Sequence, residues 1–321
     1  MSRNLNIFIV KIYRDIENIG PITNCVVTTG SFDGVHMGHQ VLINRLNELA
    51  RSIGGQSVLI TFYPHVRKVL YPDTKGKDLE MINSQQEKIE LLEKTGLDNL
   101  VIINFTREFA KTTAEEFVRN LLVEKLGAKI IVVGYNHYFG HNKEGNYDKL
   151  IELGRELNFQ VLEIPKQELE KETVGSTKIR KSLKDGKIMH ANAYLDHIYY
   201  IHTQFCKGSS LYQNAGFKTF IVNIEEGSKL IPPDGIYAIK AEIDGQFSKG
   251  MMLNNYHGKF SHPTLHKAAE ICLFDFDMDI CDKTGKVYVH RDMSKNIQVG
   301  DEERLKNQLL LIRSKIEELI Y

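Results

Sequence analysis

Short apolar segments and amphipathic segments alternate along residues 24–165, and this alternation constrains the fold most. The short segments are rich in β-branched residues and are the length of buried strands. Between them, apolar residues recur at helical spacing. Buried strands separated by amphipathic helices predict βαβ units in a parallel sheet. The strand-like segments are CVVTTG, SVLITF, NLVIINF, KIIVVG and QVLEIP.

Helix starts in this region carry recognisable signals. Ser84 with Glu87, and Thr113 with Glu116, have the spacing of a capping box. An earlier helix is predicted to begin near Gly38 and to bury one apolar face. The sequence places four residues on that face: Leu42, Leu46, Leu49 and Ile53. In a sheet of this kind the ligand crevice lies outside the carboxyl ends of the strands.

From about residue 198 the pattern changes to successive strands, which predicts a small antiparallel barrel. Asp244–Gly245 and Thr284–Gly285 are predicted to be turns between strands. Residues 301–321 form an amphipathic helix predicted to pack its Leu/Ile stripe on the barrel. The fold class is therefore α/β, with a parallel-sheet domain over 1–190 and a β-barrel domain over 191–321. The strand-like segments are YYIHTQF, TFIVNIE, GIYAIKAEI, GQFSKGMML, EICLFDFDMDI and KVYVHRDM.

The 321-residue chain carries 41 basic and 41 acidic side chains, so its formal net charge is zero. It lacks the basic field that favours nucleic acid. Its apolar runs fall short of the roughly 18 residues of a spanning helix, and no signal-peptide cleavage site is evident. The four cysteines form no C-x-x-C pair and are predicted to be reduced. The sequence predicts a cytoplasmic protein without nucleic-acid, membrane or obligate protein partners.

A glycine-rich turn, GSFDGVHMGH, joins the first predicted strand to its helix. The helix N-terminus offers unsatisfied N–H groups and the positive end of the helix dipole, which suit a phosphate. Glycines would let the backbone approach that phosphate, and histidines would add donors. Two other interpretations stay open: a metal site, to which only Asp33 adds a carboxylate, and a plain turn with surface histidines. The residues concerned are Gly30, Gly34, Gly38, His36 and His39.

Four stretches of the chain together resemble one family. GSFDGVHMGH contains an H-x-G-H box, and three further stretches follow it in order: VLITFYPHVRKVL, VVGYNHYFGHNKEGN and GSTKIRKSLKDGKI. All four resemble the signatures of the bacterial FAD synthetase family, the bifunctional riboflavin kinase/FMN adenylyltransferases. The resemblance covers nearly the whole chain. It implies a Rossmann-like nucleotidyltransferase domain followed by a riboflavin kinase-like barrel.

The resemblance also implies an activity and a site. The family transfers AMP from ATP to FMN with Mg²⁺, giving FAD and pyrophosphate. Catalytic roles are implied for His36, His39 and Arg180, with His39 nearest the transition-state charge. Binding of ATP or phosphate is implied for Gly30, Phe32, Gly34, Gly38, Asn136, Ser176 and Thr177. Flavin binding is implied for Phe62, Pro64 and His65.

Two of these assignments have competing interpretations. Ser176 and Thr177 at a helix start supply donors, and Arg180 one turn later supplies a fork for the β- and γ-phosphates. Without the other motifs, the same stretch reads as an ordinary N-cap with a solvated basic face. Gly175 also stands where the family has a serine. His137 and His141 could be metal ligands on a helix, but they fall in a predicted loop that would face the nucleotide.

The second half matches the family's kinase half less closely. The family's G-F-P-T-A-N segment, whose Thr and Asn hold Mg²⁺ and the ATP phosphates, reads GFKTFIVN here. Thr219 is retained, whereas Lys218, Phe220 and Ile221 replace proline, alanine and asparagine. Glu270 matches the glutamate that would deprotonate the flavin 5′-hydroxyl. Thr219 is thus left as a single candidate metal ligand, and the sequence predicts an impaired kinase.

Three functional hypotheses follow. The first is an FMN adenylyltransferase with a degenerate kinase barrel. The second is a bifunctional enzyme that also phosphorylates riboflavin to FMN. The third is a non-catalytic protein that binds flavin or nucleotide. The intact H-x-G-H box and Arg180 favour the first two, and the altered segment around Thr219 favours the first over the second.

Overall fold

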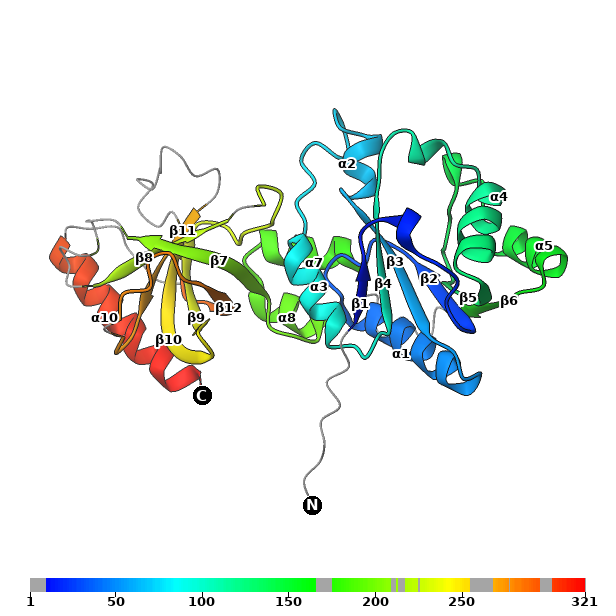
Figure 1. Cartoon of the computed structure of the whole chain (residues 1–321). Coiled ribbons are helices and arrows are strands. Elements are labelled where there is room, and N and C mark those ends of the chain that lie inside the picture. The colour runs from blue at the N-terminus through cyan, green and yellow to red at the C-terminus, as the bar shows by residue number, and fades with distance from the viewer. Residues whose placement is uncertain are drawn as a thin grey trace, which may run out of the picture. The chain divides into compact units, whose positions relative to one another are not determined.

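The computed structural model describes residues 10–165, 175–208, 212, 217–224, 226–254, 268–276, 278–294 and 302–320. The chain forms two compact units (Figure 1). The first contains Met1–Leu79 and Lys88–Val174, and the second contains Glu80–Glu87 and Gly175–Tyr321. The domain boundary predicted between residues 190 and 191 stays a prediction. The segment Glu80–Glu87, from the first half of the sequence, packs as part of the second unit.

The first unit is built on a parallel sheet of six strands, in the order β1-β4-β3-β2-β5-β6. The predicted α/β class is confirmed, and five of the strands coincide with predicted segments. The edge strand β1 was missed because its three residues are too few to show a period. The strands are β1 (Lys11–Tyr13), β2 (Cys25–Thr29), β3 (Ser57–Tyr63), β4 (Asn99–Asn104), β5 (Ala128–Gly134) and β6 (Gln160–Ile164).

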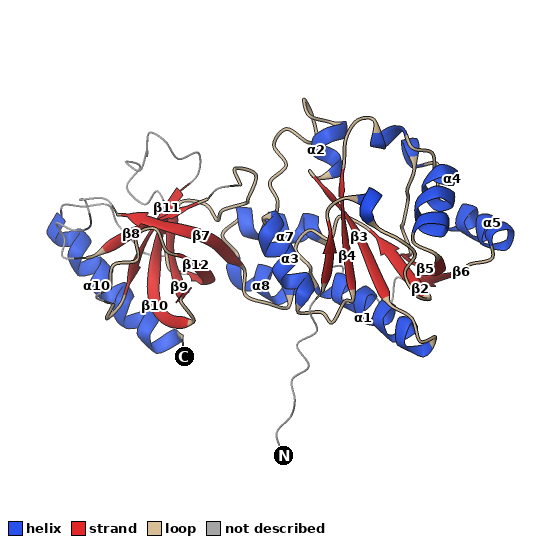
Figure 2. Ribbon diagram, in the orientation of Figure 1, coloured by secondary structure: helices blue, strands red, loops and turns tan. Residues whose placement is uncertain are grey.

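Helices connect these strands, as Figure 2 shows. Both predicted capping boxes form: Ser84 and Glu87 bond each other's backbone N–H groups, and so do Thr113 and Glu116. The helix after Thr113 continues as a π-helix. The helices are η1 (Ile16–Asn18), α1 (Met37–Ser52), α2 (Val66–Leu70), α3 (Gln85–Glu93), η2 (Phe109–Lys111), α4 (Ala114–Glu116), η3 (Phe117–Lys125), η4 (His141–Lys143) and α5 (Tyr147–Leu157).

Helices pack on both faces of the sheet. Side chains of η3 and α5 bury one face of the central strands, with Val27, Ile60 and Ile131 in that core. Helix α1 packs against β2, β3 and β5. Its buried apolar residues are Leu42, Ile43, Leu46 and Ala50. The prediction for Ile53 was wrong: this residue follows the end of α1 and is 37% exposed.

The second unit contains a closed antiparallel barrel with the strand order β10-β11-β8-β7-β12-β9. The predicted Asp244–Gly245 turn is confirmed, since both residues have positive φ between paired strands. The predicted turn at Thr284–Gly285 was wrong, because these residues open β12 and pair with β7. The strands are β7 (Tyr200–Lys207), β8 (Thr219–Asn223), β9 (Gly235–Ile243), β10 (Gln246–Asn254), β11 (Ala268–Leu273) and β12 (Thr284–Asp292).

The described residues of this unit also form the helices α7 (Ser176–Lys184), α8 (Ile188–Leu195) and α10 (Glu302–Leu319). Gly186, with a φ of 69°, separates α7 from α8. The Leu/Ile stripe of α10 packs on the barrel, where Leu309, Ile312 and Ile316 share a core with Met251. This packing of the C-terminal helix confirms the sequence prediction.

A buried ion pair fixes the segment Glu80–Glu87 to the barrel. The Lys229 ammonium bonds the Glu87 carboxylate, and both side chains are 1% exposed. The same ammonium donates to the carbonyls of Ile82 (2.7 Å) and Tyr200 (2.9 Å), and it lies over the Tyr199 ring. A buried charge is stable only when it is paired and its hydrogen bonds are satisfied. This contact therefore holds residues that are more than a hundred positions apart in the sequence.

We expect Lys229→Met to lower the free energy of unfolding of this unit by about 3–5 kcal/mol, because the Glu87 carboxylate stays buried without its cation. Urea unfolding followed by circular dichroism measures the change. The control is Lys283→Met, which removes an exposed ion pair with Asp244 and should cost less than about 1 kcal/mol. Equal losses in the two variants would contradict the assigned role of the buried pair.

Candidate active site

The turn after β2 follows an unusual backbone path. Phe32, Gly34 and Val35 all have positive φ, at 49°, 93° and 41°. A β-branched residue such as Val35 rarely adopts this conformation, so the turn is strained. The Gly30 N–H donates to the Ile60 carbonyl at 3.0 Å and ties the start of the turn to β3. The path brings residues 30–39 to the carboxyl end of the sheet.

This turn delivers two imidazoles to the N-terminus of α1. The rings of His36 and His39 stack with centroids 3.7 Å apart and planes 18° from parallel. The Phe32 ring lies 4.8 Å from His39. His36 is the N-cap residue, yet its side chain makes no capping hydrogen bond, and the first turn of α1 holds no acidic residue. A helix N-terminus without a side-chain cap from its N-cap residue is a place where an anion is favoured.

His39 is held in its neutral form. Desolvation by burial lowers its pKa well below the ordinary value, and the charges of His36 and Lys88 lower it further. The lowered pKa favours the neutral ring, which offers one N–H donor. Such a donor suits the stabilisation of charge that develops on a phosphate oxygen.

The loop after β5 lies at the same edge of the sheet. β2 is flanked by β3 and β5, so the strand order reverses between β2 and β5, where open α/β sheets bind ligands. The His137 imidazole meets the Thr29 hydroxyl across this point at 3.4 Å, and burial lowers the pKa of His137 to about 4. His141 instead bonds the Ala110 carbonyl at 3.0 Å. The two histidines therefore have different partners and do not form a metal pair. Asn136, two residues after the end of β5, is exposed.

The residues predicted to bind flavin lie at the end of β3 and just beyond it. Phe62 begins a series of aromatic rings in which each neighbour lies within 6.4 Å. Pro64 follows a cis peptide bond, and His65 caps α2 by accepting the Arg67 N–H. The structure thus gives His65 a local structural role that the sequence did not indicate. The members of the series are Phe62, Phe105, Phe109, Phe117 and Phe139.

The predicted phosphate box at α7 belongs to the second unit. Gly175 is the N-cap residue of α7, so no side chain of that residue caps the helix. Its φ is −154°, and an added Cβ would meet nothing within 4 Å. Neither the backbone conformation nor the available space therefore requires glycine instead of serine at this position. The Arg180 Nε donates to the Glu80 carbonyl at 2.9 Å. Ser176 and Thr177 occupy the first turn of α7.

In the barrel, Thr219 and Glu270 lie together. The Thr219 hydroxyl donates to the Glu270 carboxylate, and both side chains are buried. Glu270 pairs with Ile221 across β8 and β11. Side chains alternate along a strand, so Phe220 points to the opposite face from Thr219 and does not crowd it. Hydroxyl and carboxylate oxygens are ligands that Mg²⁺ accepts, whereas Ile221 supplies none.

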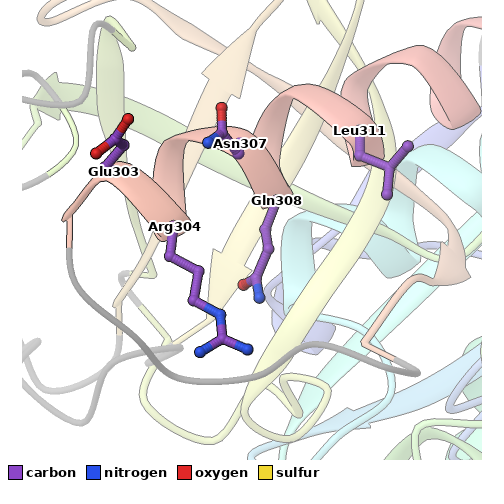
Figure 3. Close-up of a pocket in the computed structure, with 5 residues that line it drawn as sticks. All are labelled: Glu303, Arg304, Asn307, Gln308 and Leu311. Atoms are coloured by element: carbon purple, nitrogen blue, oxygen red, sulfur yellow. The ribbon is translucent and has the colours of Figure 1, made fainter.

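Two observations bear on other possible sites. Within the described part of the chain, no three His, Cys, Asp or Glu side chains gather as a metal site. A hollow on the exposed side of α10 is lined by five residues of that one helix (Figure 3): Glu303, Arg304, Asn307, Gln308 and Leu311. None of these residues is in a motif of the sequence. The structure therefore gives no reason to place chemistry there.

Thr29 and Lys88 are buried polar residues near the turn that sequence reasoning did not assign to the site. The Lys88 ammonium donates to the Thr61 hydroxyl at 3.2 Å. Thr29 ends a strand and Lys88 lies inside a helix, so neither position carries a motif. Their common signal is a polar residue at an otherwise apolar position, which a single sequence shows only weakly.

Comparison with known proteins identifies two domains. The family model for FAD synthetase matches residues 20–178, and the model for riboflavin kinase matches residues 195–317. A solved structure named as a macrolide-efflux protein from Streptococcus pneumoniae superposes with a TM-score of 0.83 at 27% identity, covering 96% of this chain and 99% of that one. The described helices of the present chain include none long and apolar enough to cross a membrane.

Three similar relatives carry the name bifunctional riboflavin kinase/FMN adenylyltransferase. The protein of Buchnera aphidicola (subspecies Schizaphis graminum) is 29% identical over 305 residues, covering 94% of this chain and 96% of that protein. The Listeria monocytogenes protein is 28% identical and covers 89% of each chain, and the Escherichia coli protein is 27% identical and covers 94% and 95%. With both family models matched in order, the chain belongs to the FAD synthetase family, the bifunctional riboflavin kinase/FMN adenylyltransferases.

Proposed function

We propose that the chain transfers AMP from Mg-ATP to FMN, giving FAD and pyrophosphate. A phosphate oxygen of FMN attacks the α-phosphorus of ATP, and the bond from that phosphorus to the bridging oxygen of the β-phosphate breaks. The observation that carries this proposal is the pair of stacked imidazoles at the open N-terminus of α1. No covalent enzyme intermediate is required, so the protein positions two phosphates and stabilises charge.

His36 and His39 have related roles in this proposal. The neutral His39 ring donates an N–H to an oxygen of the α-phosphate, where negative charge grows in the transition state. The His36 ring stacks against it and limits its rotation. The backbone around Gly30, Gly34 and Gly38 binds phosphate oxygens beside the helix end. This assignment makes the glycine-rich turn an anion site, and it sets aside the metal and plain-turn interpretations.

The remaining site assignments are supported to different degrees. The uncapped N-terminus of α7 supports phosphate binding by Ser176, Thr177 and Arg180. The aromatic series at Phe62 supports flavin binding, because isoalloxazine rings stack on aromatic side chains. The binding roles proposed for Pro64, His65 and Asn136 rest on the family resemblance. Mg²⁺ enters as the counter-ion of ATP, and a cytoplasmic location without macromolecular partners stays a prediction.

Incubation of the purified protein with FMN and Mg-ATP tests the main proposal. We expect FAD and pyrophosphate in equal amounts, separated by chromatography and measured by flavin absorbance and a pyrophosphate assay. Omission of ATP is the control. Correctly folded protein that binds FMN or ATP but forms no FAD would support the non-catalytic hypothesis instead.

We expect His39→Ala to lower kcat for FAD formation by about 10²–10³, with KM changed only a few-fold, because the donor acts mainly in the transition state. His190→Ala is the matched control, since His190 is exposed on α8 and lies in no motif. Steady-state kinetics for both variants make the comparison. If kcat of the His39→Ala enzyme stays within a few-fold of the wild-type value, His39 has a structural role only.

Phosphorylation of riboflavin is the second candidate function, favoured by the buried Thr219–Glu270 pair. We propose that this activity is impaired. Mg-ATP would find the Thr219 hydroxyl but no amide oxygen at Ile221. Lys218 lies over the Phe220 ring and donates to the Met278 carbonyl at 3.1 Å. These contacts direct the ammonium toward the loop after β11.

With riboflavin and Mg-ATP as substrates, we expect FMN to form at least about tenfold more slowly than FAD forms from FMN, because a metal ligand is missing. Ile221→Asn should raise the FMN rate and leave FAD synthesis unchanged, and Ile221→Leu is the matched control. Chromatography of the flavins reports both steps. If wild-type protein forms FMN as fast as FAD, and Glu270→Ala abolishes only that step, the protein is fully bifunctional.

A further inference from the structure

Lys88 is a buried cation close to the glycine-rich turn. Its side chain is 6% exposed, although it occupies the second turn of α3. The ammonium donates to the Thr61 hydroxyl at 3.2 Å and approaches the Ser31 carbonyl at 3.5 Å. Burial of an ammonium is costly unless its donors are satisfied. The contacts of this ammonium therefore bear on the geometry of the turn.

The hydrogen bonds lead from Lys88 into the turn. The Thr61 hydroxyl, which accepts from Lys88, donates to the Ser31 carbonyl at 3.1 Å. Ser31 directly precedes Phe32, which has a φ of 49° and packs its ring on His39. Gly30, on the other side of Ser31, leaves room for that ring, because an added Cβ would come within 3.0 Å of it. The position of the Ser31 carbonyl therefore fixes the ring that supports His39.

We propose that Lys88 is a positioning residue for adenylyl transfer, which anchors the Ser31 carbonyl and presents a fixed positive charge to His39. This inference rests on the proposed function, and it adds a residue that lies outside the H-x-G-H box. Lys88 acts through Ser31, Phe32 and His39 and is not itself placed against the reacting phosphates.

Electrostatics agree with the geometry. The positive charge of Lys88 contributes to the lowered pKa of His39, after desolvation and the charge of His36. The other titratable groups near the turn are Asp33, which is buried within it, and His137, which bonds Thr29. Removal of the ammonium lets His39 hold a proton to a higher pH. The part of the kcat profile that follows the titration of His39 would then move to higher pH.

The test compares Lys88→Met with Lys88→Arg, which keeps a cation, and with Lys94→Met, which removes an exposed cation just beyond α3. Two measurements are made on each folded variant. Nuclear magnetic resonance of ring-labelled histidine gives the pKa of His39, whose signal is assigned by its loss in His39→Ala. Steady-state kinetics give kcat and KM for FAD formation as a function of pH.

We expect Lys88→Met to raise the pKa of His39 and to move the acid limb of the kcat profile upward by the same amount. At neutral pH kcat should fall about 10–100-fold with KM nearly unchanged, as for a misplaced catalytic group. Lys88→Arg should retain the low pKa of His39, and Lys94→Met should match the wild type. An unchanged His39 pKa in folded Lys88→Met overturns the proposal, whatever happens to kcat.

If Lys88→Met does not fold, Thr61→Val provides the second test, because it removes the hydroxyl between Lys88 and Ser31 while keeping the shape and the cation. It should lower kcat and leave the pKa of His39 low, and full activity in this variant overturns the anchoring role. The resonance titration needs no substrate. A wild type that makes no FAD would therefore refute the proposed function, while the His39 titration would still decide the role of Lys88.

Discussion

The strained turn between β2 and α1 is the constraint on which the candidate site depends. Positive φ at Phe32, Gly34 and Val35 costs free energy, of order 1–3 kcal/mol for each non-glycine residue in this region. The sheet and the hydrogen bonds at Ser31 hold the backbone in this path. The result is a helix N-terminus with two imidazoles beside it and no side-chain cap from its N-cap residue. In the proposed function this helix end is the phosphate site.

The two units solve the problem of buried charge in different ways. In the second unit, Lys229 is matched by the Glu87 carboxylate and by two carbonyls, which makes it a structural fixture. In the first unit, Lys88 bonds the Thr61 hydroxyl, and its positive charge still reaches a neighbouring imidazole. Glu87 and Lys88 are adjacent residues of α3, and their side chains contact different units: Glu87 bonds Lys229 of the second unit, and Lys88 bonds Thr61 of the first.

The sequence predicted the layers and the barrel because apolar periodicity and caps are local signals. It missed β1, which is too short to show a period, and it placed a turn at Thr284–Gly285 because glycine is also used inside strands. The H-x-G-H turn was located by its glycines and histidines. The contact of Lys88 with Thr61 joins α3 to β3, and only the folded chain brings those positions together.

The discontinuous second unit affects how this chain could be divided. A fragment cut between residues 190 and 191 would keep every strand of the barrel and lose Glu80–Glu87, with the carboxylate that neutralises Lys229. Gene fusion or exchange of halves at that junction would therefore not transfer an independent module.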